Sequence, residues 1–499
     1  MKFVMGVDLG TSAVKVLLLN QNGEVCVEVS KSYPLIQEKS GYSEQNPEYW
    51  VEKTIEAISD LVKQFDGNVM DIEGLSFSGQ MHGLVLLDQD YQVLRHAILW
   101  NDTRTTKQCQ QIYDIVGKEK LLEITKNPAL EGFTLPKLLW VKENERELFD
   151  QAAVFMLPKD YLRFRITGQI HSEYSDAAGT LLLNVSEKVW SQEICELLTI
   201  DSSICPPLVE SHDYVGPITE AFANATGLDK SIKVFAGGAD NACGAIGAGI
   251  LSEGKSLCSI GTSGVILSYE ENKDRDFQGK VHYFNHGKEN VFYTMGVTLA
   301  AGYSLSWFKD VFAENENFND LLSEVGNVPI GANGLLFTPY LVGERTPYAD
   351  STIRGSFIGI DASHSKKDFV RAVLEGITFS LNESIEIFRE SGKSIDTIVS
   401  IGGGAKNETW LQMQADIFDA KIQKLSSEQG PGVGAAMLAA VGCGWSPSLQ
   451  ECAEQFIDSA KTYEPVQENV EKYKRLFTIY KQVYSQTREL NEGLKLFRK

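Results

Sequence analysis

The apolar positions of this chain outline one short pattern twice, about half a chain apart. In each copy an apolar run ends at a Gly-Thr-Ser triplet and a second apolar run follows, around Gly10-Thr11-Ser12 and again around Gly261-Thr262-Ser263. The apolar runs are residues 3–7 and 14–19 in the first copy and residues 257–260 and 265–268 in the second. Short apolar runs bounded by glycine and hydroxyl residues predict two strands joined by a tight turn.

The elements that follow the two turns also correspond. In the first half, Asn22-Gly23 predicts a hairpin to a strand over residues 25–29, and a helix after Pro47 precedes a strand over residues 72–77. The second half has a strand over residues 291–295, a helix over residues 303–312 and a strand over residues 398–401. The repetition predicts an α/β fold of two domains related by duplication.

The length of 499 residues is too great for one ordinary domain and agrees with two. We place the boundary near residues 249–254, which gives domains 1–249 and 250–499 with a cleft between them. Residues 210–226 are expected to form a loop. Residues 473–494 have helical spacing of apolar positions, so we expect a packed C-terminal helix there.

A glycine followed by two hydroxyl residues leaves backbone N–H and side-chain O–H groups free to converge on an anion, and phosphate is the anion that we favour. The two copies differ at one position, where the first has Asp8 and the second has Ser259. A turn-capping role for Asp8 is the common alternative. Two phosphate turns with a single carboxylate predict one nucleoside triphosphate and one metal ion, with Asp8 beside the metal.

Asp240 is the candidate general base. It follows Gly237-Gly238-Ala239 after a short strand and precedes a helix of small residues, so a simple N-cap role is the alternative. The two glycines allow a ligand to approach closely, and a carboxylate at a helix N-terminus is expected to stay ionised and exposed. We expect Asp240 to serve both as the cap and as the base.

Two further glycine-containing segments follow predicted strands. Gly402-Gly403-Gly404 excludes side-chain bulk, so a flat ring could lie against it with Asn407 as a hydrogen-bonding partner; a flexible turn is the alternative. In Gln80-Met81-His82-Gly83, a solvent-facing histidine beside an amide and a thioether could bind sugar hydroxyls. A single histidine is more often structural, and composition alone does not single out His82.

Composition narrows the class of protein. The net charge of −21 argues against a nucleic-acid partner or an anionic membrane surface, since both require basic patches. The eight cysteines lack C-x-x-C spacing, and the apolar run near the N-terminus stops at Asp8, so we expect a cytoplasmic protein with reduced thiols, no signal peptide and no membrane span. A P-loop is absent, and residues 430–435 fit a turn into a helix over residues 435–441 better than a dinucleotide site.

Taken together, these motifs resemble the FGGY family of carbohydrate kinases over nearly the whole chain. The matching stretches are residues 6–12, 78–83, 99–102, 132–140, 157–162, 175–180, 237–241, 261–265, 343–347, 372–376 and 402–405. Small departures are Ala13 and Ala239, which stand where the family has glycine and remove no functional group. Residues 348–353 have no counterpart to which a role can be assigned.

The resemblance implies two ribonuclease-H-like, actin-like ATPase domains with a cleft between them, and Mg²⁺ and ATP as cofactors. It implies that the two Gly-Thr-Ser turns hold the triphosphate and that a sugar meets it in the cleft. By position, the implied roles are Asp8 for the metal, Thr11, Ser12, Gly261, Thr262, Gly403, Gly404 and Asn407 for ATP, Gln80, Met81, His82, Asp240 and Asn241 for the sugar, and Asp240 as base. Family likeness also favours a homodimer.

Within the family, the stretch of residues 80–83 favours D-xylulose as the substrate, with D-xylulose 5-phosphate as product. The alternatives are a kinase for another ketose or polyol, such as ribulose, gluconate or glycerol, and an ATP-driven conformational protein of the same fold without a sugar substrate. A dinucleotide oxidoreductase is the weakest alternative.

Overall fold

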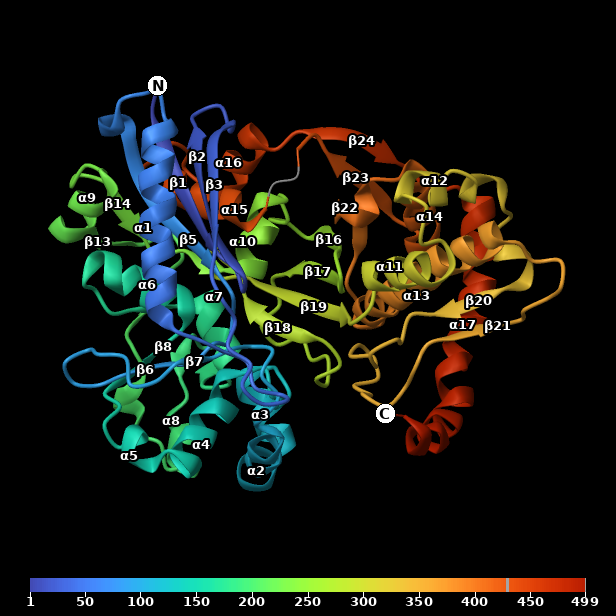
Figure 1. Cartoon of the computed structure of the whole chain (residues 1–499), viewed down its shortest axis with the longest axis horizontal. Coiled ribbons are helices and arrows are strands. Elements are labelled where there is room, and N and C mark those ends of the chain that lie inside the picture. The colour runs from blue at the N-terminus through green and yellow to red at the C-terminus, as the bar shows by residue number, and fades with distance from the viewer. Residues whose placement is uncertain (428–429, 499) are drawn as a thin grey trace.

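The computed structural model describes residues 1–427 and 430–498. These residues form two α/β lobes, and Figure 1 shows the lobe built mainly from the first half of the chain on the left and the other lobe on the right. Each lobe is built on a central mixed sheet whose strands follow one another in the same spatial order. The predicted two-domain α/β fold is confirmed.

The first sheet has the strand order β13-β14-β5-β1-β2-β3. β1 pairs antiparallel with β2 and parallel with β5, and the short β15 extends the sheet beside the end of β5. The bounds are β1 (Phe3–Leu9), β2 (Ala13–Asn20), β3 (Val25–Ser32), β5 (Ile72–Gly79), β13 (Tyr214–Pro217), β14 (Lys233–Phe235) and β15 (Gly238–Ala239).

The second sheet has the order β18-β19-β17-β16-β22-β23-β24. Its β16 pairs antiparallel with β17 and parallel with β22, as β1 does with β2 and β5, and both sheets end in an antiparallel edge strand. The bounds are β16 (Gly254–Ile260), β17 (Gly264–Glu270), β18 (His282–Asn285), β19 (Phe292–Thr298), β22 (Ile395–Gly402), β23 (Lys421–Leu425) and β24 (Ser459–Tyr463).

Helices cover the sheets. One face of the first sheet packs against α1 (Pro47–Gln64), which begins as predicted at Pro47, with the Asn46 side chain accepting from the Glu48 N–H. In the second lobe α13 (Lys366–Glu390) is almost wholly buried between the sheet and outer helices. The outer helices are α11 (Gly302–Phe312), α12 (Phe318–Leu322), α14 (Glu408–Phe418) and α17 (Gln467–Leu494), so the predicted C-terminal helix is confirmed.

Residues between β5 and β13 form an additional helical region, seen at the lower left of Figure 1. Its strands β6 (Val85–Leu87) and β8 (Val154–Met156) pair with each other. Its helices are α2 (Thr106–Val116), α3 (Lys118–Thr125), α4 (Thr134–Asn144), α5 (Arg146–Phe149), α6 (Pro158–Thr167), α7 (Tyr174–Ala177) and α8 (Gln192–Leu197).

The prediction of a loop over residues 210–226 is wrong. This stretch contains β13 and α9 (Glu220–Thr226), which begins where the Thr219 hydroxyl accepts from the Phe222 N–H. Both elements are too short for a periodic pattern, and it is the burial of Phe222 against α1 that stabilises the helix.

Two helices cross between the lobes. α10 (Asp240–Gly247) follows β15, and α15 (Pro431–Gly442) corresponds to the helix predicted for residues 435–441 but begins earlier, at a proline in its first turn. The two lie so close that a Cβ built on Gly434 would stand 1.9 Å from the Cys243 carbonyl oxygen. α15 and α16 (Leu449–Phe456) share a core with β1 and β2, so part of the second half of the chain completes the first lobe.

None of the described helices is both long and apolar enough to cross a lipid bilayer.

Candidate active site

Two cavities meet at the second Gly-Thr-Ser turn. A cavity of about 270 Å³ is lined by Asp240 and Asn241 together with Ser263, and a cavity of about 360 Å³ is lined by Gly261 and Thr262. The turn between β16 and β17 is therefore the wall that the two cavities share. We refer to them as the Asp240 cavity and the Gly403 cavity.

Asp240 is the first residue of α10, and the residue in the N-cap position is Ala239. The prediction that Asp240 caps this helix is therefore wrong by one residue, because β15 keeps pairing with β5 as far as Ala239. The Asp240 Oδ1 atom accepts from the Asn241 N–H at 2.7 Å and from the Asn241 side-chain amide at 2.9 Å. These bonds orient the carboxylate but leave its Oδ2 atom for a ligand.

The electrostatics of Asp240 also differ from the prediction of an exposed, fully ionised carboxylate. Burial raises the pKa of Asp240 to about 7, and the negative charge of Asp8 raises it further in the same direction. The hydrogen bonds from Asn241 oppose this shift. A carboxylate with a pKa near neutrality is well matched to accept a proton from a hydroxyl group.

Met81 and His82 line the Asp240 cavity together with Asp240 and Asn241. His82 is not solvent-facing: its ring packs against Phe133 and Phe284, and its Nδ1 lies 2.6 Å from the Gly179 carbonyl oxygen. Burial lowers the pKa of His82 to about 3, so the ring is neutral, Nδ1 carries the proton, and Nε2 is an acceptor. His82 also has a backbone φ of 68°, a strained value that is typical of residues at functional sites.

Several residues of this cavity were not assigned from the sequence. They are Trp100, Phe133, His282, Phe284 and Arg345, and they come from both lobes. Trp100, Phe133 and Arg345 belong to stretches that resemble the family, and this was the only signal available for them. His282 and Phe284 alternate along β18 and stack on each other, a pattern that also fits an ordinary half-buried strand.

Gln80 does not line the Asp240 cavity. It is buried, and its side-chain amide donates to the Gly10 carbonyl oxygen at 3.4 Å and to Gln45 at 3.3 Å. Gln45 in turn donates to the Thr11 carbonyl oxygen at 2.6 Å. Gln80 thus supports the first Gly-Thr-Ser turn from behind, where it has no access to a ligand in this cavity.

The first turn lies next to the Asp240 cavity. The indole N–H of Trp100, which lines that cavity, donates to the Thr11 hydroxyl at 2.9 Å. Ser12 is exposed, and its carbonyl oxygen accepts from the Tyr33 N–H. Neither Thr11 nor Ser12 is in the lining of either cavity.

The Gly403 cavity is open, partly apolar and built entirely from the second lobe. Gly403 and Asn407 line it together with Tyr303, Lys406 and Trp410. Asn407 is the N-cap of α14, where its Oδ1 accepts from the Trp410 N–H at 2.9 Å, so only its amide N–H group is left to donate to a ligand. Gly404 is buried beneath the cavity, since a Cβ there would stand 2.5 Å from the Ile260 side chain.

Asp8 lies one residue before the end of β1, close enough to Asp240 for its charge to raise the pKa of that residue. Burial raises the pKa of Asp8 as well, while Ser78 and Lys15 oppose the shift. Among the described residues no group of three or more histidine, cysteine or acidic side chains could hold a metal ion. One free carboxylate fits a Mg²⁺ ion bound mainly by phosphate oxygens and water, and it does not fit a metal held by protein ligands alone.

Comparison with known proteins agrees with this architecture. The models for the N-terminal and C-terminal domains of the FGGY family of carbohydrate kinases match residues 3–247 and 256–443. Xylulose kinase of Bacillus subtilis (strain 168) is 68% identical over 499 residues, which cover 100% of both chains, and xylulose kinase of Staphylococcus epidermidis is 50% identical over 98% of both. The crystal structure of ligand-bound xylulose kinase from Lactobacillus acidophilus superimposes with a TM-score of 0.93 at 30% identity, covering 98% of this chain and 99% of that one. The chain therefore belongs to the FGGY family of carbohydrate kinases.

Proposed function

We propose that the protein transfers the γ-phosphoryl group of ATP to the terminal hydroxyl of D-xylulose, giving ADP and D-xylulose 5-phosphate. The observation that carries the proposal is the turn shared by the two cavities. The cavity on one side holds a carboxylate with a pKa near 7, and the cavity on the other side has a glycine floor and no carboxylate in its lining. A triphosphate lying over the turn would join an adenosine on one side to a sugar on the other.

In this arrangement Asp240 accepts the proton of the sugar hydroxyl as its oxygen attacks the γ-phosphorus, and ADP leaves. Met81, His82 and Asn241 hold the sugar, with the neutral His82 Nε2 accepting from one of its hydroxyls. Thr11, Ser12, Gly261 and Thr262 surround the phosphates, and Gly403, Gly404 and Asn407 form the adenosine site. Phosphoryl transfer depends mainly on such positioning and on charge stabilisation.

Mg²⁺ bound near Asp8 would neutralise charge on the transferring phosphoryl group. Asp8 is suited to hold its hydration shell because it lies one residue before the end of β1, just ahead of the Gly10-Thr11-Ser12 turn. The choice of D-xylulose rests on the xylulose kinases to which the chain is similar over its whole length.

The test is to measure ADP release with D-xylulose, D-ribulose, D-gluconate and glycerol, and to identify the product by mass spectrometry and NMR. We expect the highest kcat/KM with D-xylulose and a phosphate on C5. A higher kcat/KM with another sugar or polyol would assign that substrate instead. ADP release at the same rate without any sugar would indicate an ATPase and contradict the proposal.

A further inference from the structure

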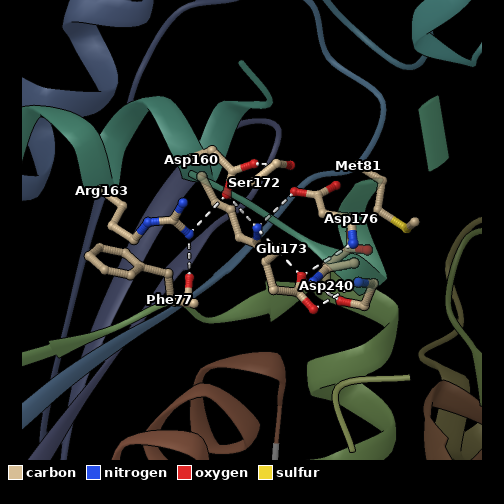
Figure 2. Close-up of polar contacts among 12 residues, drawn as sticks. Phe77, Met81, Asp160, Arg163, Ser172, Glu173, Asp176 and Asp240 are labelled. Carbon is tan, nitrogen blue, oxygen red and sulfur yellow. Dashed lines mark hydrogen bonds and ion pairs between the residues drawn. The ribbon is translucent and has the colours of Figure 1, made fainter. Parts of the chain in front are cut away.

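A cluster of buried charges lies directly behind Asp240. It consists of Lys159, Asp160, Arg163, Glu173 and Asp176, whose side chains are all 0% exposed. Lys159 Nζ lies 2.7 Å from Asp160, 3.2 Å from Asp176 and 3.6 Å from Glu173. Figure 2 shows Asp160, Glu173 and Asp176 near Asp240, with Arg163 toward the left of the view and Met81 toward the right.

Burying so many charges is costly, and replacing such a group by apolar residues often leaves stability unchanged or improved. The cluster therefore calls for an explanation other than stability. Burial and the neighbouring carboxylates raise the pKa of Asp176 well above its usual range, while the nearby charge of Lys159 opposes the shift.

Three hydrogen-bonded connections run from this cluster to the backbone just before Asp240. Arg163 Nη1 donates to the Ala236 carbonyl oxygen at 2.7 Å. Glu173 accepts from the Ser175 hydroxyl at 2.8 Å, and the Ser175 oxygen in turn accepts from the Ala239 N–H at 2.9 Å. Glu173 also accepts from the Ser211 hydroxyl at 2.6 Å, and the Ser211 carbonyl oxygen accepts from the Gly237 N–H.

The bond at Ala239 matters because β15 is only two residues long and pairs with β5 along one edge. Ser175 supplies the acceptor for the Ala239 N–H, which is buried. Without that acceptor the N–H would be unsatisfied, at a cost of about 1–3 kcal/mol, and the segment could escape the cost by moving. Ala239 is the residue whose backbone sets the start of α10 and hence the direction of the Asp240 side chain.

We infer that Ser175, oriented by Glu173, is a positioning residue for the general base. It touches neither cavity lining, and it acts by fixing the Ala239 peptide so that the Asp240 carboxylate points into the sugar site. This inference rests on the proposed role of Asp240. It predicts that losing the Ser175 oxygen impairs the chemical step more than it impairs substrate binding.

The protein offers a matched control in Ser172. Its hydroxyl donates to Asp160 at 2.8 Å, so it joins the same cluster through the same kind of bond, whereas its hydroxyl hydrogen bond does not lead to the Ala239 N–H. Both serines are buried. Ser175→Ala and Ser172→Ala should therefore lower the melting temperature by similar amounts, while only the first should change catalysis.

The experiment compares kcat, the KM values for sugar and ATP, and the melting temperature of the full-length wild type and both variants. We expect Ser175→Ala to lower kcat roughly ten- to hundredfold with both KM values within about twofold of wild type, since a displacement of about 1 Å can cost 10²-fold. Ser172→Ala should keep the wild-type kcat. Equal kcat losses in both variants, or a wild-type kcat in Ser175→Ala, would overturn the inference.

If Ser175→Ala does not fold, Ser175→Cys keeps most of the volume and replaces the oxygen with a weak acceptor, and it should show the same selective loss of kcat. The sugar used is whichever one the wild type phosphorylates best. Failure of the wild type to phosphorylate D-xylulose would refute the proposed function alone, whereas the ratio between the serine variants tests the positioning role.

Discussion

The two Gly-Thr-Ser turns have the same local fold but are supported in different ways. In the first lobe the carbonyl oxygens of Gly10 and Thr11 accept hydrogen bonds from side chains, those of Tyr33, Gln80 and Gln45. In the second lobe the carbonyl oxygens of Gly261 and Thr262 accept from the backbone N–H groups of Gly302 and Tyr303, at 2.8 and 3.1 Å. These donors belong to the first turn of α11, where N–H groups lack a partner within the helix.

The two lobes also differ in which candidate functional groups they contain. Two of the segments that support the first turn also reach the Asp240 cavity. Trp100 lines the cavity and donates to Thr11, and Gln80 directly precedes Met81 in the cavity lining. Both candidate acidic groups, Asp8 and Asp240, also belong to the first lobe, and the second lobe has Ser259 in place of Asp8. Under the proposed function, the first lobe would carry the reacting groups and the second lobe the nucleotide site.

The largest expected effect on the proposed difference between the lobes comes from replacing the proposed base, Asp240. Asp240→Asn keeps the size and the hydrogen bonds to Asn241 but cannot accept a proton, so kcat should fall by about 10²–10⁴-fold. Sugar binding, followed by calorimetry or intrinsic fluorescence, should stay within a few fold of wild type. A turnover close to wild type would show that the base lies elsewhere.

A paired substitution at the two equivalent positions tests the asymmetry directly. Asp8→Asn should reduce kcat by on the order of 10²-fold, because it removes the carboxylate beside the phosphates. Ser259→Ala, at the corresponding position of the second copy, should change kcat by no more than about twofold. Similar losses from the two variants would mean that the lobes share the metal-binding role.

The pH dependence of kcat/KM tests the coupling between Asp8 and Asp240 in the first lobe. A protonated Asp240 cannot accept a proton, so kcat/KM for the sugar should fall about tenfold per pH unit below a pKa of about 7 and level off above it. Because the charge of Asp8 contributes to raising this pKa, the acid limb measured for the residual activity of Asp8→Asn should move to lower pH. An acid limb that does not move would place Asp8 too far away to interact with the base.

The smallest expected effect concerns the nucleotide site of the second lobe. A Cβ on Gly403 would meet the Ile260 carbonyl oxygen at 3.4 Å, an ordinary contact, so Gly403→Ala should fold normally. Its methyl group would enter the Gly403 cavity and raise the KM for ATP by a few fold, at about 1 kcal/mol or less, without changing the KM for the sugar. A selective rise in the sugar KM would reverse the assignment of the two cavities.

The sequence predicts the main strands and helices of the two lobes well, because these elements depend on local patterns of apolar and turn residues. The strands on either side of both turns, the helix after Pro47 and the C-terminal helix were all recognisable from apolar spacing and turn residues. The two-domain repeat followed from them. The prediction for residues 210–226 failed because short elements there are stabilised by tertiary burial, which leaves no periodic signal.

The candidate site was predicted less completely, for a physical reason. Its residue types were visible, but their environments are set by partners distant in the sequence, such as Phe133 and Phe284 around His82. The same holds for Asp240, whose pKa depends on burial and on Asp8, more than two hundred positions away. Gln80 illustrates the limit most clearly, since its neighbours Met81 and His82 line the cavity while Gln80 itself faces the first turn.

The packing of α15 and α16 against the first sheet also determines where the chain could be cut into folded fragments. The face of the first sheet with Val4, Leu17 and Leu19 is covered by α15 and α16, which come after nearly all of the second sheet in the sequence. A fragment ending near residue 250 would leave this face without its cover. The first lobe therefore gains its complete core only after α15 and α16, near the end of the chain, have been synthesised.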